Sequence, residues 1–499
     1  MSLAQDLLPL PLYTAAQARE LDARLIAAGT PGFELMQCAA HAAWRALRRR
    51  WPQAGEVSVL AGAGNNAGDA YLLAALAHKA GWAVRVLALG EPTRLSGDAA
   101  LACAEARGAG VAIEAWQGEA QLRGIVVDGL LGTGFHGALR APYAEAIEQI
   151  NGSGLPVLAL DLPSGLHADS GQVAEQAVRA DLTVSFIGLK LGLFTGDAPD
   201  WIGDLQFDDL QADPQLLAAQ PCTALRLAGA QVPRLAPRSR TAHKGLFGHV
   251  LVVAGDRGFG GAALLAAESA LRSGAGLVTL ATRGEHVAAS LARRPEVMCM
   301  AIDSTYQLPR LCEQADVLVV GPGLGRQAWG RSLLSAVAAS PRPQVWDADA
   351  LNLLADGAVE LPADSVLTPH PGEAARLLGC TAAEVQVDRP AAALALAQRY
   401  QAVVVLKGAG SLIAAPDGRL LLADRGHPAM AGAGLGDVLV GLIGALRGQG
   451  LGAFDAAALG VWLHASAGQL LGAGGRGLAA SDLIPTIRQL LEEHCACLQ

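Results

Sequence analysis

The sequence predicts an α/β fold in two domains, and three observations lead to this prediction. The chain has 499 residues, more than a single hydrophobic core usually organises, so two domains are expected. Hydrophobic residues make up 52% of the chain and aromatic residues only 4%, which is typical of stacked helices and parallel strands. Apolar strand-like runs also alternate with helical stretches, as in parallel sheets with right-handed crossovers.

The first half opens with two helices and continues as alternating strands and helices. We expect a helix over 15–28, capped by Thr14 and ended by Gly29, and a second over 33–50. The alternating series that follows consists of strands over 56–62, 83–90, 124–132, 156–161 and 181–187, and helices over 71–80 and 97–108.

Periodicity fades between residues 208 and 240, where prolines collect, so we place a domain boundary near residue 220. A second alternating series follows this segment. Its strands are expected over 250–254, 277–281, 317–320, 344–346, 365–368 and 403–406, and its helices over 262–272, 331–339, 350–355, 373–378, 391–400 and 438–446.

Charge and composition limit the partners of the chain. A net charge of −9 argues against a nucleic-acid surface, which needs a basic face. No apolar run reaches the ~18 residues of a membrane span, and the N-terminus does not read as a signal peptide. The eight cysteines include no Cys-x-x-Cys pair, so we expect free thiols in a reducing compartment and a cytoplasmic protein.

A glycine-rich turn, residues 430–437, precedes an apolar helical pattern and ends at Asp437. Glycines allow backbone N–H groups to approach an anion, and the helix that follows directs its positive end to the same place. A carboxylate beside such a cradle suits phosphoryl transfer, in which it takes a proton from the attacking hydroxyl. A turn in which Asp437 only caps the helix explains this segment equally well.

Further polar motifs follow strands of the second half. Gly321–Gly325 allows close backbone approach, and Asp349 either holds Mg²⁺ or, as we favour, caps a helix. His370 stands between two prolines that fix its backbone, which suits a positioned contact as well as a structural turn. Lys407 is one of only four lysines among 37 basic residues, and it begins a Gly-Ala-Gly-Ser stretch typical of phosphate binding.

Polar residues also follow the strands of the first half, where an open α/β sheet binds its ligand. Residues 65–69 form a turn before a helix, where backbone amides could bind a pyrophosphate or where two asparagines only form the turn. Asp128 and Ser164 follow two strands and, together with Asn66, could supply oxygen ligands to a hard cation. The loop over residues 132–137 is flexible enough to close over a ligand.

Taken together, these motifs resemble two known families. The second half is similar to the ADP/ATP-dependent NAD(P)H-hydrate dehydratase family through 243–245, 321–325, 347–352, 368–373, 407–411 and 434–437. The first half resembles the NAD(P)H-hydrate epimerase domain through 64–69, Asp128, 131–134 and 161–165. The match follows the order of the bifunctional bacterial repair enzymes, and it implies a Rossmann-like three-layer parallel-sheet domain over 1–220 and a ribokinase-like α/β domain over 221–499.

The resemblance implies the repair of NADH and NADPH that are hydrated at C6 of the nicotinamide ring. The first domain would interconvert the R and S epimers with the help of K⁺. The second would phosphorylate the C6 hydroxyl of the S epimer with ADP or ATP and Mg²⁺, after which phosphate leaves. The substrates would be the two hydrates and ADP or ATP, without nucleic-acid or membrane partners, and we expect a homo-oligomer.

The resemblance also assigns roles to residues. Asp161 and Asp437 would be catalytic, and Asp161 would transfer a proton or orient the substrate. K⁺ would be held by Asn66, Asp128 and Ser164, and the nucleotide phosphates by Lys407, Gly408, Ala409, Gly410, Ser411 and Gly436. The substrate would be contacted by Asn65, Asn66, Ala67, Gly68, Asp69, Gly132, Thr133, Gly134, Phe135, His136, Gly137, Ala138, Asp161, Ala262, Gly323, His370 and Asp437.

The sequence departs from both family patterns. Ala67 and Ala70 replace two glycines of the usual epimerase motif, which is harmful only where the backbone needs a positive φ. Gly432 and Ala433 replace the usual Thr-Gly of the dehydratase. Two alternatives therefore stay open: a ribokinase-like small-molecule kinase fused to a binding domain, and a first domain that serves only as a ligand-binding or scaffold module.

Overall fold

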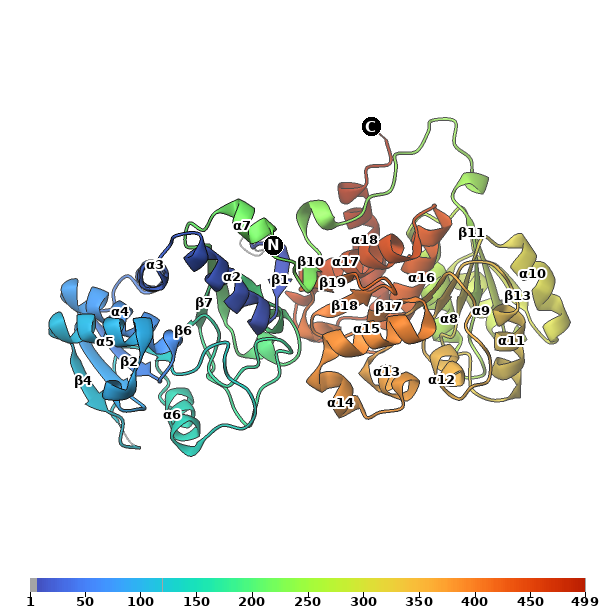
Figure 1. The fold of residues 1–499 in the computed structure, drawn as a ribbon. Coiled ribbons are helices and arrows are strands. Elements are labelled where there is room, and N and C mark those ends of the chain that lie inside the picture. Colours follow the sequence, from blue (N-terminus) through green and yellow to red (C-terminus); the bar gives the residue numbers. More distant parts are fainter. Residues whose placement is uncertain (1–6, 119, 499) are drawn as a thin grey trace. The chain divides into compact units, whose positions relative to one another are not determined.

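The computed structural model describes residues 7–118 and 120–498 and divides into two compact units (Figure 1). The first unit ends at Leu225 and the second begins at Arg226. This division lies in the proline-containing segment in which the sequence placed a boundary near residue 220. No helix within the described ranges has the length and apolar character needed to cross a bilayer.

The first unit is built on a seven-stranded sheet whose neighbouring strands are all parallel. Its strand order is β4-β3-β2-β5-β6-β7-β9. The strands are β2 (Glu56–Ala61), β3 (Ala83–Ala88), β4 (Ala112–Ala115), β5 (Ile125–Gly129), β6 (Val157–Leu160), β7 (Leu182–Phe186) and β9 (Asp204–Asp208). The predicted parallel sheet is therefore confirmed, with β4 and β9 as additional strands at its edges.

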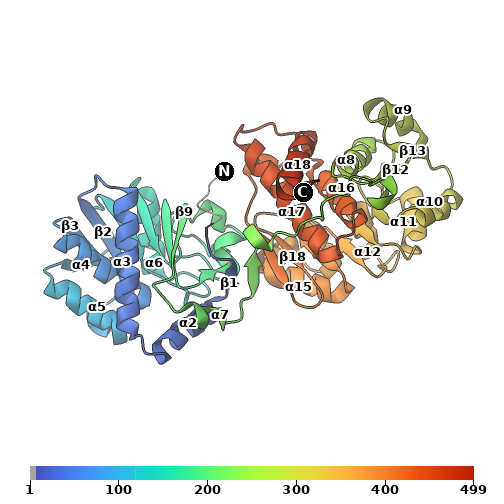
Figure 2. The same ribbon diagram turned by 90° about the horizontal axis from the view of Figure 1, so that it is seen from above.

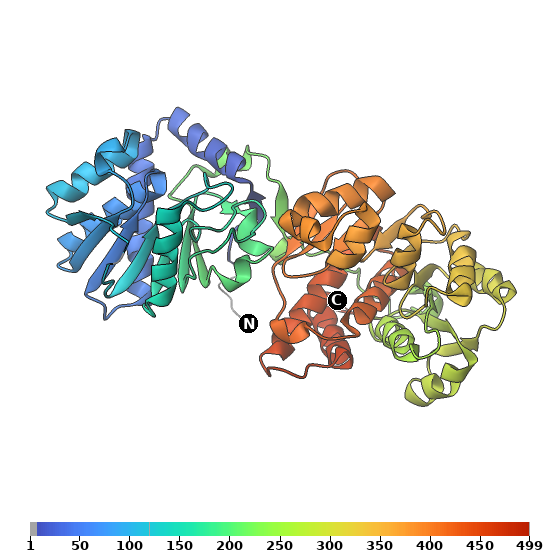
Figure 3. The same cartoon turned by 90° about the horizontal axis from the view of Figure 1, so that it is seen from below.

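Helices cover both faces of this sheet and make three layers. In Figure 2, seen from above, α3 (Gly32–Arg50), α4 (Asn65–Lys79) and α5 (Gly97–Gly108) lie in front of the strands. Figure 3, seen from below, has α6 (Ala141–Gly152) in front instead. Each face buries its own apolar cluster, one under α3 to α5 and the other under α6. The three layers hold the carboxyl ends of β2, β5 and β6 side by side at one edge of the sheet.

Three short strands and two helices complete the first unit. β1 (Pro11–Tyr13) pairs with β8 (Leu189–Lys190) in parallel and with β10 (Ala224–Arg226) in antiparallel fashion. In the chain, α2 (Ala15–Ala27) follows β1, and α7 (Pro214–Ala218) precedes β10. α2 begins where the sequence predicted, because the Thr14 hydroxyl accepts a hydrogen bond from the backbone N–H of Gln17.

α4 begins at Asn65, six residues before the predicted start at residue 71. The segment 65–69 is therefore the first part of a helix and not a turn. The glycines and asparagines of this segment conceal the helical pattern from a propensity argument. Ala67 and Ala70 lie inside α4, outside the positive-φ region, and both are fully buried. A methyl group is therefore compatible with the backbone at both positions.

The second unit contains a parallel sheet extended by an antiparallel hairpin. The strand order is β13-β12-β11-β14-β15-β16-β17-β18-β19, parallel as far as β17 and antiparallel beyond it. The strands are β11 (His249–Val253), β12 (Leu277–Thr282), β13 (Met298–Ala301), β14 (Val317–Val320), β15 (Gln344–Trp346), β16 (Ser365–Leu367), β17 (Val403–Leu406), β18 (Ser411–Ala414) and β19 (Leu420–Ala423). All six predicted strands are present.

The helices of the second unit are α8 (Gly260–Arg272), α9 (Gly284–Arg293), α10 (Leu308–Gln314), α11 (Ala328–Ala338), α12 (Asp349–Ala355), α13 (Pro371–Leu378), α14 (Ala382–Val387), α15 (Arg389–Tyr400), α16 (Leu435–Gly448), α17 (Ala453–Gly472) and α18 (Ala480–His494). α16 packs against α8, against α17 and against the strands β11, β14 and β15. The N-terminus of α16, whose first turn carries Asp437, thereby lies at the carboxyl edge of the parallel strands.

Candidate active sites

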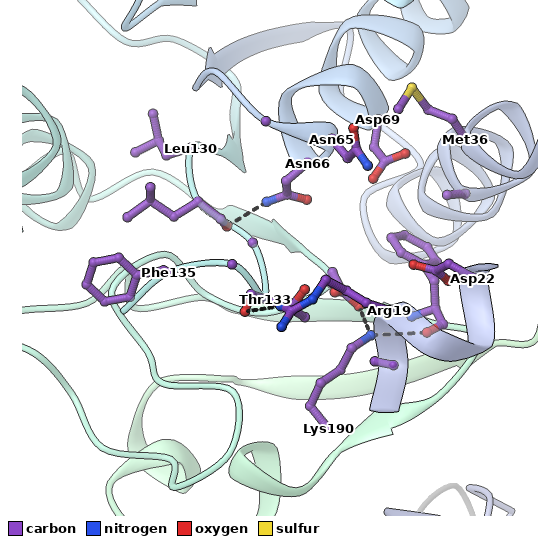
Figure 4. Close-up of a pocket in the computed structure, with 18 of the residues that line it drawn as sticks. Arg19, Asp22, Met36, Asn65, Asn66, Asp69, Leu130, Thr133, Phe135 and Lys190 are labelled. Atoms are coloured by element: carbon purple, nitrogen blue, oxygen red, sulfur yellow. Dashed lines mark hydrogen bonds and ion pairs between the residues drawn. The ribbon is translucent and has the colours of Figure 1, made fainter. Parts of the chain in front are cut away.

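A cavity of about 630 Å³ opens at the carboxyl ends of the strands in the first unit (Figure 4). Most residues that the sequence assigned to substrate binding in this unit line it. These are Asn65, Asn66, Asp69, Gly132, Thr133, Gly134, Phe135, His136, Ala138 and Asp161. Gly137 is absent from the lining. Ala67 and Gly68 are absent too, because they lie on the buried face of α4, where Gly68 faces the side chain of Met36.

Asn66, Asp128 and Ser164 are brought together behind this cavity. The Ser164 hydroxyl donates to Oδ1 of Asp128 at 2.6 Å and accepts from the backbone N–H of Leu131 at 2.8 Å. The Asn66 amide donates to the Leu131 carbonyl at 2.7 Å. Burial raises the pKa of Asp128 to about 6.

One oxygen of this group lacks a hydrogen-bond donor. Oδ1 of Asn66 is buried, and no described group donates to it. An orphaned buried oxygen is costly, and a cation removes that cost. Amide, hydroxyl and carboxylate oxygens together form the donor set of a hard monovalent cation, so the residues fit K⁺. A different kind of metal site, made of three or more His, Cys, Asp or Glu side chains, is absent from the described ranges.

Asp161 makes an ion pair that the sequence did not predict. Nζ of Lys190 contacts Oδ1 of Asp161, and the Ser185 hydroxyl donates to the same oxygen at 3.2 Å. Asp161 has a φ of 65°, an unusual backbone conformation for a residue other than glycine, and strain of this kind clusters at functional sites. Lys190 is buried, and the one signal for it in the sequence is the scarcity of lysine.

Three further carboxyl groups line the same cavity, those of Asp22, Asp69 and Asp98. Asp69 lies on α4, and Asp22 comes from α2, a helix to which the sequence assigned no chemistry. Desolvation by burial and then the neighbouring Asp161 raise the pKa of Asp69 well above its ordinary value. Burial, opposed by Lys190, raises the pKa of Asp22 to about 6. The cavity is thus lined by four carboxyl groups and one lysine.

In the second unit Asp437 occupies the first turn of α16, directly after Gly434. Gly434 has a φ of 87°, so the turn requires a residue that tolerates the left-handed region. Burial and then the neighbouring Asp347 raise the pKa of Asp437 to about 7, against a lowering influence from Lys407. A carboxylate with a pKa near neutrality suits a general base.

Lys407 was predicted to bind phosphate, and the structure places it in an ion pair. Its Nζ donates to Oδ1 of Asp347 at 2.6 Å and lies 3.9 Å from Oε2 of Glu373. Thr368 donates to the same Asp347 oxygen at 2.8 Å. A Cβ built on Gly436 would lie 3.3 Å from both Nζ of Lys407 and Oδ2 of Asp347. Gly436 therefore lets this ion pair approach the turn that carries Asp437.

The remainder of the 407–411 stretch is a tight loop between β17 and β18. Gly408 has a φ of 140° and Gly410 a φ of 62°, while the Ser411 hydroxyl donates to the Gly408 carbonyl at 2.9 Å. Ala409 is exposed at the tip of the loop. Arg389, which the sequence did not single out, is buried and donates to the carbonyls of Lys407 and Gly410.

The remaining residues predicted for the hydrate site are His370, at the start of α13, and the neighbouring pair Ala262 and Gly323. His370 caps α13, where its ring accepts from the Gly372 N–H at 3.0 Å and lies 3.4 Å from Glu373, which also faces Lys407. Ala262 and Gly323 lie close together, because a Cβ on Gly323 would be 3.4 Å from that of Ala262.

The prediction that Asp349 caps its helix is wrong. The N-cap of α12 is Ala348, and Asp349 accepts a hydrogen bond from Gly325 N–H at 2.8 Å. It therefore stabilises the 321–325 loop.

Comparisons with known proteins agree with this two-site arrangement. Residues 250–489 match the family model described as NAD(P)H-hydrate dehydratase, and residues 32–192 match that described as YjeF-related protein N-terminus. Two relatives are both named bifunctional NAD(P)H-hydrate repair enzyme Nnr. The one from Coxiella burnetii is 44% identical over 96% of this chain and 99% of its own length. The one from Escherichia coli is 44% identical over 92% of this chain and 89% of its own.

A solved structure of the ADP/ATP-dependent NAD(P)H-hydrate dehydratase from Bacillus subtilis, co-crystallised with ATP and Mg²⁺, is 29% identical. The similarity covers 53% of this chain and 100% of that one, with a TM-score of 0.48. The two relatives span nearly the whole chain in one continuous match, and each half also matches a family model of its own. The chain therefore belongs to the family of bifunctional NAD(P)H-hydrate repair enzymes.

Proposed function

We propose that the chain restores hydrated NADH and NADPH in two steps. The first unit, which includes residues 1–220, interconverts the R and S epimers. The second, which begins at Arg226, dehydrates the S epimer with ADP or ATP. The observation that carries this proposal is the presence, in one chain, of two separate carboxylate sites, each built around one of the four lysines.

In the first unit the hydrated nicotinamide occupies the cavity beside Asp161. The dinucleotide is contacted by Asn65, Asn66, Asp69, residues 132–136 and Ala138, and the N-terminal amides of α4 face its phosphates. Asn66, Asp128 and Ser164 would hold K⁺, which when bound supplies a fixed positive charge near the loop at Leu131. The unpaired oxygen of Asn66 supports this assignment. Asp161, held in place by Lys190, transfers a proton.

In the second unit Asp437 removes the proton of the C6 hydroxyl as that oxygen attacks the terminal phosphate of the nucleotide. The 407–411 loop and Gly436 hold the nucleotide, whose Mg²⁺ neutralises charge on the phosphates. Ala262, Gly323 and His370 line the hydrate site. The phosphate then leaves C6 with its electron pair and a neighbouring ring carbon loses a proton, so that the net reaction is that of a lyase.

The identity of the products separates this proposal from a small-molecule kinase on the same fold. With the S hydrate and ATP, we expect reduced nicotinamide and free phosphate to form together in equal amounts. A stable phosphorylated hydrate, detected by ³¹P NMR, would establish the kinase instead. The proposal also includes assembly into a homo-oligomer, which light scattering tests. It further includes a cytoplasmic location without nucleic-acid or membrane partners, which cell fractionation tests.

The cation assignment has its own test. Epimerisation is expected to increase with K⁺ concentration in the wild type, and Ser164→Ala is expected to raise the K⁺ concentration needed for half-maximal activity. Ser58→Ala is the matched control, because this buried serine of the same sheet forms its hydrogen bonds with the backbone of Arg123. A wild-type enzyme with equal epimerase activity in K⁺ and in a bulky organic cation would contradict the assignment.

A further inference from the structure

The helix α2 contributes to the epimerase cavity although it lies before the region matched by the family model, which begins at residue 32. Arg19 and Asp22 of α2 both line the cavity. A guanidinium nitrogen of Arg19 donates to the carbonyl of Thr133 at 3.4 Å, which links the helix to the 132–138 loop (Figure 4). α2 is therefore a wall of the site and not only an N-terminal extension.

The lysine and the carboxyl groups around Asp22 are unequally paired. The one ammonium group, Lys190, contacts Asp161 and also donates to the Phe186 carbonyl at 3.1 Å. Neither Asp22 nor Asp69 makes a hydrogen bond or an ion pair with any described residue, yet both side chains border the cavity. Carboxyl groups that border a cavity without a protein partner are available to a ligand.

We propose that Asp22 is the second proton-transferring group of the epimerase site and acts together with Asp161. This inference rests on the proposed function of the first unit. It assigns to α2 a catalytic carboxyl group, and it explains why this helix is fixed to the rest of the unit at its capped start and through Arg19.

The chemistry of an epimerisation requires two such groups. One carboxylic acid gives its proton to the C6 hydroxyl, the C6–O bond breaks, and its electron pair leaves with water. The resulting cation is shared by C6 and the ring nitrogen. Water then adds to C6 on the opposite face and gives a proton to the other group, which is a carboxylate from the start and becomes a carboxylic acid. One proton has been given and one taken, so the reaction is balanced. A cavity lined by four carboxyl groups and one lysine stabilises the cation.

The pH dependence follows from the groups around Asp22. Facing it are Lys190 on β8, Asp161 after β6 and Asp69 on α4, whereas α7, which packs on α2, carries no ionisable side chain. Tyr13 lies on β1, which also packs on α2, and burial raises its pKa. Asp22 and Asp161 must share one proton, so kcat should fall on both sides of an optimum.

The test measures epimerisation and dehydration in the same full-length chain. Asp22→Asn is expected to lower the kcat of epimerisation by ~10²–10⁴-fold with little change in KM and to remove one limb of the pH profile. Asp22→Glu should recover part of the rate, since it keeps a carboxyl group. Glu20→Gln is the matched control, because Glu20 is an exposed residue of α2 that pairs with Arg24. Dehydration of the pure S epimer should be unchanged in all three.

The proposal is overturned if Asp22→Asn retains its kcat, if its loss is confined to KM, or if both limbs of the pH profile persist. It is also overturned if Asp22→Asn and Asp22→Glu lose activity equally while thermal unfolding of both matches the wild type. A wild-type chain that dehydrates the S epimer but does not epimerise would instead refute the proposed function of the first unit.

Discussion

The two sites of this chain use the same pair of residue types in different arrangements. In the first unit Lys190 contacts the proposed proton-transfer residue, Asp161, directly. In the second unit Lys407 pairs with Asp347, and the proposed base Asp437 is left beside that pair. Because Lys407 pairs with Asp347 and not with Asp437, the charged neighbour that acts most strongly on Asp437 is the carboxylate of Asp347. Burial and this carboxylate together raise the pKa of Asp437 to about 7.

The difference shows how one chain can adapt similar groups to two reactions. A general base works best when its pKa lies near the working pH, and the second site provides this through a like-charged neighbour. The first site instead orients its carboxylate through an ion pair and a strained backbone position. Substitutions that affect one arrangement should leave the reaction of the other unit intact.

The largest effect is expected from Asp437→Asn. Loss of the base should lower nucleotide-dependent dehydration by ~10²–10⁴-fold, while epimerisation, followed by NMR, stays at the wild-type rate. Asp455→Asn is the matched control, since Asp455 is an exposed carboxylate in the first turn of the neighbouring helix α17. Retained dehydration in Asp437→Asn would refute the assignment of the base.

The converse substitution, Asp161→Asn, should spare dehydration of the S epimer and lower epimerisation by about 10²-fold or more. The amide keeps the shape of the side chain but loses the charge that Lys190 contacts. Asp200→Asn, at an exposed position of the same unit, serves as the control. If Asp161→Asn epimerises like the wild type, the proton transfer belongs to another residue.

Asp347→Asn tests the origin of the raised pKa of Asp437. Dehydration in the wild type should decline as the pH falls through about 7, because the base becomes protonated. Removing the negative charge of Asp347 lowers the pKa of Asp437, and the freed Lys407 lowers it further, so the acidic limb should move to lower pH. The measurement is the pH profile of kcat with saturating nucleotide. An unmoved limb would mean that Asp347 does not set this pKa.

The smallest effect is expected from restoring the family glycines at Ala67→Gly and Ala70→Gly. Both positions are helical and fully buried, so each change should lower the free energy of unfolding by about 1–2 kcal/mol, through helix propensity and the lost methyl group. Ala16→Gly, at an exposed helical position of α2, measures the propensity part alone. Urea unfolding provides the values. A gain in epimerase activity after either restoration would show that the methyl groups hinder the site.

The sequence was sufficient to locate the central strands of both sheets and most side chains at their carboxyl ends. β14, β15 and β17 begin and end at the predicted residues, because continuous apolar runs bounded by glycine or polar residues are unambiguous. α4 was misjudged because its first turn is rich in asparagine and glycine.

What the sequence could not supply was the pairing of charges across long separations. Lys190 with Asp161, and Lys407 with Asp347, are joined by the arrangement of strands and not by any local spacing. For the same reason Asp22, distant in sequence from every motif, was missed. The phosphate role of Lys407 stays a prediction, and the glycines on which it rests carry no information about the ion pair with Asp347.

The most direct test of the two-site account is the extent to which racemic hydrated NADH is converted. The full-length chain is incubated with the racemate and ADP or ATP, and absorbance of the reduced nicotinamide is followed against a blank that corrects for spontaneous epimerisation. The account predicts complete conversion by the wild type and half conversion by Asp161→Asn. Half conversion by the wild type, or complete conversion by Asp161→Asn at the wild-type rate, would contradict it.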